Sequence, residues 1–219
     1  MKRGAIITLA WPEGMTTAAG AWYDKFFSKN GKYRVGHSAL VMINFEKETS
    51  HYFDFGRYHT AKGYGRVRDG ETDPALTIQK PIIKDNNILN IEEILFQVSK
   101  IKETYGKGKL YASLITGVDF EKAFLKAKHT QKQGMVAYGP FIIKGTNCSR
   151  FVATVLRVSV PSFLKKLRFK YQFCISPSPK RNVSITNNNY YVIDKKRCIK
   201  VKKNKLQAYF TSIENYKEQ

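Results

Sequence analysis

The sequence has few acidic residues. Its 219 residues include 17 aspartates and glutamates against 38 lysines and arginines, which gives a formal net charge of +21 at pH 7. Such an excess of positive charge favours polyanionic partners, such as nucleic acid, anionic lipid or an acidic cell-wall polymer. A general lysine bias that serves only solubility explains the composition equally well.

Cysteines and metal-binding motifs are also scarce. The three cysteines, Cys148, Cys174 and Cys198, cannot form a complete disulfide framework, so we expect reduced thiols. The CxxC and HExxH patterns are absent, and the "GKGK" at Gly106 lacks the Walker pattern. The sequence therefore predicts no metal centre and no nucleotide site, and we expect no cofactor.

No apolar run is long enough to cross a membrane. The N-terminal "MKRGAIITLAWPEG" has an apolar run of only about eight residues, at the lower edge of a signal-peptide core. Trp11, Pro12 and Glu13 follow where a signal peptide would have small residues. We therefore interpret residues 4–10 as a strand, and expect a protein that is cytoplasmic or exported without a classical signal.

The remaining composition is that of a globular chain, with 42% hydrophobic and 13% aromatic residues. Hydrophobic periodicity and turn residues predict an α+β fold, an antiparallel sheet with flanking helices. The expected strands cover residues 4–10, 33–45, 51–58, 75–83 and 109–118, and the expected helices cover 15–29, 90–106 and 119–134.

The amino-acid composition of the chain changes after residue 160. Residues 161–219 are rich in Pro, Ser, Asn and Lys, and hold 14 lysines and arginines against 3 acidic residues, a net charge of +11. We therefore divide the chain into a domain of residues 1–160 and a basic C-terminal extension of residues 161–219. This extension could bind an anionic polymer, a membrane surface or nucleic acid, or it could be merely solvated.

One cysteine stands at the start of a predicted helix. In "GTNCSRFVATVL", Asn147 is a good N-cap, so Cys148 would be the first helical residue, and an apolar stripe follows it. Unpaired amides and the helix dipole at that position lower a thiol pKa, which favours a reactive thiolate. The alternative is a small buried residue that only packs.

A reactive thiol also needs a base. Among the four histidines, His51 and His129 are expected to be exposed. His37 begins a long apolar strand and follows Gly36, which allows another backbone or a substrate to approach closely. His37 is therefore the better candidate, against a purely structural role.

Taken in order, "GHSALVMI", "YFDFGRY" and "NCSRFV" resemble the circularly permuted branch of the papain-like, NlpC-type cysteine hydrolases over roughly residues 1–160. The resemblance implies a permuted papain-like catalytic domain, in which the strand histidine precedes the helix cysteine. It implies that Cys148 is the nucleophile, that His37 moves the proton, and that a polar residue on a neighbouring strand orients the imidazole.

The third member of this triad is left open between two residues. Asp54 fits by its chemistry, as a carboxylate among aromatic residues, although it could instead pair with Arg57 or a lysine. A hairpin turn centred near residues 47–48 would place His37 opposite Tyr58 or His59, and an earlier turn or a bulge would favour Asp54. We choose Asp54 and keep His59 as second.

Three further residues are candidates for substrate binding. Arg66 and Arg68, in a glycine-rich loop, could hold a substrate carboxylate in a bidentate manner, or the loop could be solvated. Tyr138 lies shortly before Cys148 and could line the cleft or only turn the chain.

Together with the resemblance, these observations predict a cysteine peptidase or amidase that cleaves amide bonds, with peptidoglycan-type peptides as the expected substrate. One alternative is a lipid or thioester acyl hydrolase, or an acyltransferase, at anionic membranes. The other is a non-catalytic module that binds a polyanion.

Overall fold

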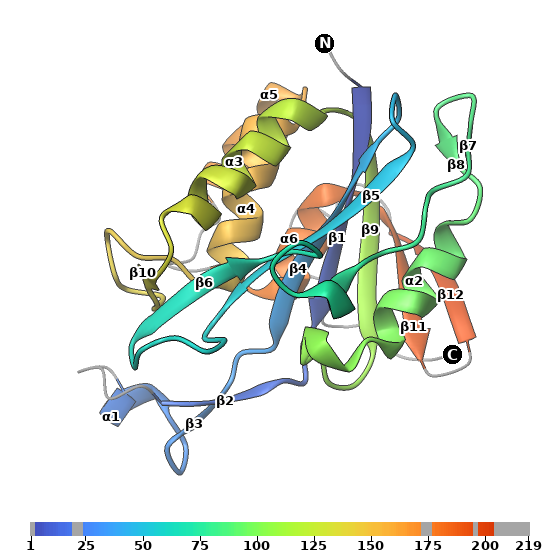
Figure 1. The fold of residues 1–219 in the computed structure, drawn as a ribbon. Coiled ribbons are helices and arrows are strands. Elements are labelled where there is room, and N and C mark those ends of the chain that lie inside the picture. Colours follow the sequence, from blue (N-terminus) through green and yellow to red (C-terminus); the bar gives the residue numbers. More distant parts are fainter. Residues whose placement is uncertain (1–2, 19–23, 172–176, 195–196, 204–219) are drawn as a thin grey trace.

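One antiparallel sheet organises the molecule. The computed structural model describes residues 3–18, 24–171, 177–194 and 197–203, and within them eight strands form a sheet in the order β10-β6-β5-β4-β1-β9-β11-β12 (Figure 1). The strands are β1 (Arg3–Trp11), β4 (His37–Asn44), β5 (Thr49–Gly56), β6 (Tyr64–Arg68), β9 (Leu110–Asp119), β10 (Val136–Ala137), β11 (Asn189–Asp194) and β12 (Arg197–Lys202).

Helices cover both faces of this sheet. On one face lie α3 (Phe120–Lys132), α4 (Cys148–Ser159), α5 (Phe163–Lys170) and α6 (Pro179–Thr186), and on the other lies α2 (Ile91–Lys100) with the short helices η1 (Pro74–Leu76) and η2 (Lys102–Thr104) (Figure 1). Side chains of a strand alternate between faces. Ile6 therefore joins the core under α4, whereas Ile7 joins the core under α2.

Side-chain caps fix where the helices next to the site begin. The Asn147 side chain accepts a hydrogen bond from the backbone N–H of Arg150, and Asp119 accepts one from Lys122. Each cap satisfies an amide that would otherwise lack a partner. The predictions that a helix begins at Cys148 and that another follows Asp119 are confirmed. Within the described residues, no helix is long and apolar enough to cross a membrane.

Several predicted elements differ from the structure. The helix expected over residues 90–106 ends at Lys100 and is followed by the short helix η2, and the strand expected over residues 33–45 is interrupted between Arg34 and His37, where Gly36 has a φ of +64°. Residues 75–83 form no long strand, because side chains from other segments hold their backbone: Gln97 accepts from the N–H of Gln79, and Asn90 accepts from that of Ile82. In place of a helix over residues 15–29 there are β2 (Met15–Thr17) and α1 (Asp24–Phe27), and residues 19–23 lie outside the described residues. The other short strands are β3 (Lys32–Arg34), β7 (Ile83–Lys84) and β8 (Asn87–Ile88).

The chain after residue 160 continues the same sheet and core. Strand β11 pairs with β9, with Tyr191 opposite Ala112. The buried Asn182 of α6 donates a hydrogen bond from Nδ2 to the carbonyl oxygen of Ser149, at 2.8 Å, in the first turn of α4. Strands from both sides of the predicted division at residues 160/161 therefore belong to one sheet, and apolar residues of the basic C-terminal region pack in the core beneath it.

The β4–β5 hairpin sets the geometry of the site. Ala39 lies opposite Asp54, and Asn44 lies opposite Thr49, so the turn covers residues 45–48. This is the earlier turn that the sequence left open. His37 lies two residues before Ala39, the partner of Asp54, so the side chains of His37 and Asp54 lie diagonally opposite each other on the same face of the hairpin.

Candidate active site

His37 is the first residue of β4 and so lies at one end of this strand. The preceding Gly36 has a φ of +64°, and a Cβ atom there would lie 2.5 Å from the carbonyl oxygen of Trp11. Only glycine permits this close crossing. The imidazole stacks on the Trp11 ring, with centroids 5.7 Å apart and 22° between the planes, and His37 is 9% exposed. The neighbouring backbone and ring thus fix its position.

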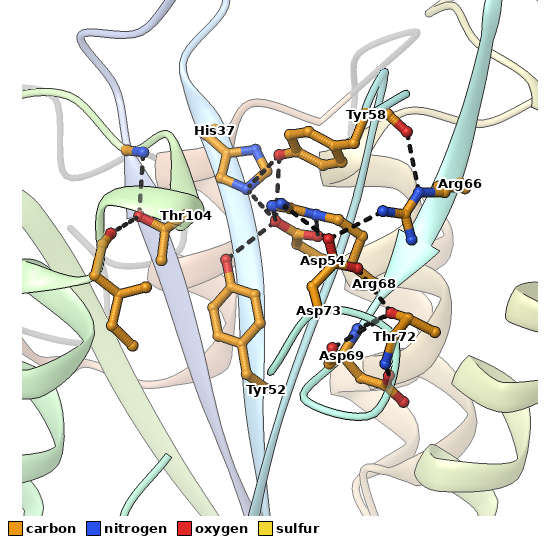
Figure 2. A network of polar contacts seen from close by, with 12 residues as sticks. His37, Tyr52, Asp54, Tyr58, Arg66, Arg68, Asp69, Thr72, Asp73 and Thr104 are labelled. Atoms are coloured by element: carbon orange, nitrogen blue, oxygen red, sulfur yellow. Dashed lines mark hydrogen bonds and ion pairs between the residues drawn. The ribbon is translucent and has the colours of Figure 1, made fainter. Parts of the chain in front are cut away.

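A buried carboxylate fixes the imidazole orientation. His37 Nε2 lies 3.0 Å from Asp54 Oδ2, and Asp54 is 0% exposed (Figure 2). An ionised carboxylate only accepts hydrogen bonds, so Nε2 carries the proton. Nδ1 is therefore the ring nitrogen left for the thiol. This is the geometry that a triad requires of its orienting residue.

Asp54 receives further donors from its own strand, from the segment that follows this strand and from β6 (Figure 2). Arg68, opposite Asp54 in the strand register, donates from Nε to Oδ1 at 3.0 Å and from Nη2 to Oδ2 at 2.6 Å. The hydroxyls of Tyr52 and Tyr58 donate to Oδ2 at 3.1 Å and 3.2 Å. These bonds compensate for the burial of the charge.

The charge balance of Asp54 follows from these contacts. Burial by itself would raise the pKa of Asp54, but the hydrogen bond and charge of His37, together with Arg68, lower it below its ordinary value. The Arg68 guanidinium lies 3.3 Å from the centre of the Tyr58 ring and 5.4 Å from that of Tyr105. Arg68 is thus held by a carboxylate and by two aromatic faces.

Cys148 meets His37 at the same end of the sheet. Its burial would raise the thiol pKa, but the hydrogen bond and charge of His37 outweigh this, with smaller contributions from Ser149 and from the Ser38 backbone. The thiol pKa is therefore lowered. For His37, burial would lower the pKa, but the interactions with Asp54 and Cys148 raise it to about 9. These opposite shifts favour transfer of the thiol proton to the imidazole, which gives a thiolate–imidazolium pair.

A cleft of about 430 Å³ opens beside His37. Tyr58, Tyr105 and Tyr138 line it, together with the cations Arg57 and Lys62, and no carboxylate of the described residues does. Cys148 is not among the lining residues and is 6% exposed. The cleft therefore reaches the imidazole, and the sulfur lies largely below its surface.

The comparisons with known proteins place the chain in a family. A family model described as type VI secretion system effector TseH-like matches residues 6–163. The chain belongs to this TseH-like family. The crystal structure of the type VI secretion system effector TseH superposes with a TM-score of 0.62 at 15% sequence identity, covering 92% of this chain and 99% of that chain. The two proteins thus share a fold. No curated protein matches the sequence.

The TseH-like structure brings together His37, Asp54 and Cys148 of the predicted site. Tyr138 lines the cleft beside them. His59, the second candidate for the triad, is exposed, adopts a φ of +51°, and contacts none of the three through a described hydrogen bond. Asp54, not His59, bonds to the imidazole in this geometry.

Arg66 and Arg68 of the TseH-like chain do not line the cleft. Arg66 donates to the carbonyl oxygen of Tyr58 and to Asp73, each at 3.0 Å, and Arg68 is buried against Asp54. Their predicted contact with a substrate carboxylate finds no support in this arrangement. Both guanidinium groups are engaged within the protein.

Sequence reasoning missed Trp11, Tyr52 and Tyr58. The signal for Tyr52 was present, because it precedes Asp54 by two residues and so shares its face of the strand. The stacking of Trp11 on His37 depends on the β1–β4 register, which places these two residues opposite each other. Among the described residues, no group of three or more His, Cys, Asp or Glu side chains could hold a metal ion.

Proposed function

We propose that this protein is a cysteine-dependent hydrolase with a permuted papain-like fold, which cleaves amide bonds in peptidoglycan-type peptides. The observation that carries the proposal is the chain of contacts from the Cys148 thiol through His37 to the buried Asp54 carboxylate. Membership in a family of type VI secretion system effectors fits such an activity.

The first half of the proposed reaction forms an acyl-enzyme. The Cys148 thiolate attacks the substrate carbonyl carbon, and the carbonyl oxygen becomes an oxyanion. The Cys148 amide, as the first N–H of α4, has no intrahelical partner and is available to this oxyanion. The His37 imidazolium then donates its Nδ1 proton to the leaving amine, the C–N bond breaks, and a thioester remains.

The second half returns the enzyme to its resting state. Neutral His37 takes a proton from water, and the resulting hydroxide attacks the thioester carbonyl. The C–S bond breaks, which releases a carboxylic acid and restores the thiolate–imidazolium pair. Asp54 stays ionised throughout and keeps Nε2 protonated. Because only 6% of Cys148 is exposed, the substrate must enter through a local opening in the cleft wall beside His37.

The lining of the cleft favours a substrate with negative charge. Arg57 and Lys62 line it together with aromatic faces, and no carboxylate of the described residues lines it. Stem peptides of peptidoglycan present free carboxylates beside their amide bonds, so they match this lining in charge.

Digestion of purified sacculi tests the proposal. We expect the wild type to release new muropeptides, and Cys148→Ala to release none. Cys198→Ala is a matched control, because this half-buried thiol, with its pKa raised to about 11 by burial and Glu92, lies outside the site. Identical muropeptide profiles for the wild type and Cys148→Ala would refute the proposed activity.

A second candidate function is acyl hydrolysis on lipids at an anionic membrane. It is favoured by α5, where Phe163 and Leu164 are 70% and 71% exposed beside Lys166 and Lys170. Exposed apolar and basic residues on one helix are typical of membrane contact. Release of fatty acid from phospholipid vesicles by the wild type, and not by Cys148→Ala, would support this function over the first.

A further inference from the structure

A second hollow lies between α3 and α4, away from the cleft beside His37. It has a volume of about 180 Å³ and is lined by the C-terminal half of α3, the loop that precedes α4, and the first turns of α4. In Figure 1 this loop lies beside the C-terminal end of α3. The cations Lys126, Lys144 and Arg150 line it, and no carboxylate of the described residues does.

Arg150 is the most informative residue of this hollow. Its side chain is half-buried, and burial lowers its pKa. Its Nη1 group donates to the carbonyl oxygens of Gly139 at 3.2 Å and Ile142 at 3.0 Å. Within the described residues, no acceptor bonds to its Nε or Nη2 groups. These two groups form the edge of a guanidinium that binds two oxygens of one oxyanion.

Three other polar groups of the hollow have donors to spare as well, whereas the hydroxyls of Thr130 and Thr146 donate to backbone carbonyl oxygens. Among the described parts of the chain, Lys126 and Lys144 form no ion pair and the Thr154 hydroxyl has no hydrogen-bond partner. Lys128, two residues further along α3, differs: its Nζ bonds to Asp69 and to Glu71. Lys128 is thus neutralised, whereas no carboxylate of the described residues pairs with the cations of the hollow.

We propose that this hollow binds a phosphate group. Three cations suit a group with a charge of about −2 better than a single carboxylate, and a phosphate offers three or more acceptor oxygens to the guanidinium edge, the ammonium groups and the hydroxyl. A volume of about 180 Å³ holds several waters, and so has room for a phosphate and part of the group that carries it.

The site is tested by titrating the Cys148→Ala protein with inorganic phosphate and monitoring its backbone amide resonances by NMR. We expect saturable shifts around α3 and α4. Arg150→Lys keeps the charge and removes the bidentate Nε and Nη2 donor pair, so it should weaken phosphate binding about tenfold. The double variant Lys126→Ala/Lys144→Ala should weaken it at least as much. Circular dichroism checks that each variant is folded.

A charge-matched control separates a built site from general attraction to a basic protein. The double variant Lys122→Ala/Lys132→Ala removes the same charge from α3, at residues that do not line the hollow. We expect phosphate affinity within about twofold of the parent protein, since exposed charges are screened at physiological salt. Equal weakening by the two double variants, or no saturable binding at all, would overturn the proposal.

Vesicles distinguish a lipid phosphate from a soluble one. Ile143, beside Lys144, is 93% exposed and could enter the apolar layer of a membrane. If the phosphate belongs to a lipid, vesicles that contain phosphatidylglycerol should bind the protein, inorganic phosphate should compete, and Ile143→Ser should weaken vesicle binding but not phosphate binding. Phosphate binding without vesicle binding assigns the site to a soluble ligand. Neither readout depends on catalysis, so the failure of this proposal is distinct from failure of the proposed hydrolase activity.

Discussion

Two arginines that are both removed from full contact with water have opposite surroundings. Arg68 donates twice to the buried Asp54 carboxylate and lies against the rings of Tyr58 and Tyr105. Arg150 donates only to two backbone carbonyl oxygens, beside two lysines that form no ion pair within the described residues. Burial alone therefore does not reveal the task of a cation. The hydrogen-bond partners reveal it. Arg68 bonds to a carboxylate within the protein, whereas Arg150 keeps N–H groups that can bind a ligand.

The strongest way to break this contrast is Asp54→Asn. The substitution removes the carboxylate that orients His37 and raises its pKa, so the His37 pKa should fall and the Cys148 pKa should rise. Arg68 would then lose its two bonds to a carboxylate and keep only the longer contact of its Nη1 with Asp73 Oδ1, at 4.0 Å. We expect the turnover of sacculi to fall about 10³-fold. The pH dependence of Cys148 alkylation gives an independent check, since its onset should move to higher pH. Asp73→Asn, which removes the partner of Arg66 and a carboxylate 4.0 Å from Arg68, keeps the His37–Asp54 bond and should leave both unchanged.

The next largest effect is expected in stability, from Arg68→Met. Removing Arg68 takes two charge-assisted bonds from the buried Asp54 and leaves His37 to balance its charge, so the free energy of unfolding should fall by about 3 kcal/mol. The matched variant Arg66→Met disrupts a pair with Asp73 in which both side chains are partly exposed, and should cost at most about 1 kcal/mol. Urea denaturation measures both changes, and similar losses would show that the Arg68 pair is not special.

The raised pKa of His37 predicts a pH dependence of the hydrolysis rate, an effect smaller than those of Asp54→Asn and Arg68→Met. The imidazolium must protonate the leaving amine, and it loses its proton above a pKa of about 9. Hydrolysis should therefore fall about tenfold per pH unit above that value. Alkylation of Cys148 should continue there, because the thiolate persists. A parallel decline of the two rates above pH 9 would mean that His37 does not act as the acid.

The smallest effect should come from Tyr58→Phe. The hydroxyl lies 3.3 Å from His37 Nε2 and 3.2 Å from Asp54 Oδ2, but Asp54 keeps its bonds to His37, Arg68 and Tyr52. The ring also still covers the guanidinium. We expect kcat/KM to fall less than about tenfold, which corresponds to one neutral hydrogen bond. A larger loss with an altered pH profile would give Tyr58 a direct part in placing the imidazole.

Local patterns in the sequence predicted the parts of the site that depend on local structure. Asn147 caps the helix of Cys148 because its side chain reaches an amide three residues away, which is a short-range effect. The β4–β5 hairpin was predictable for the same reason, since few residues separate its strands. Only its register was open, and a shift of the turn decided between Asp54 and His59.

Contacts between distant segments were beyond sequence reasoning. Residues 64–68 have the composition of a glycine-rich loop, yet they form β6 because β5 offers them a free edge, and this pairing alone brings Arg68 to Asp54. Likewise, the strand predicted for residues 75–83 fails because Gln97 and Asn90 satisfy its backbone from a distance. The local sequence of either segment therefore does not predict its secondary structure.

The hydrogen bond from Asn182 to the carbonyl oxygen of Ser149 has a consequence for the order of assembly. A ribosome releases residue 149 well before residue 182, so a growing chain has its nucleophile but not the α6 residue that seats the helix beneath it. The first turn of α4 should thus reach its final position last, when α6 has folded against it. Under the proposed hydrolase function, a chain still in synthesis would therefore hold Cys148 without a complete site.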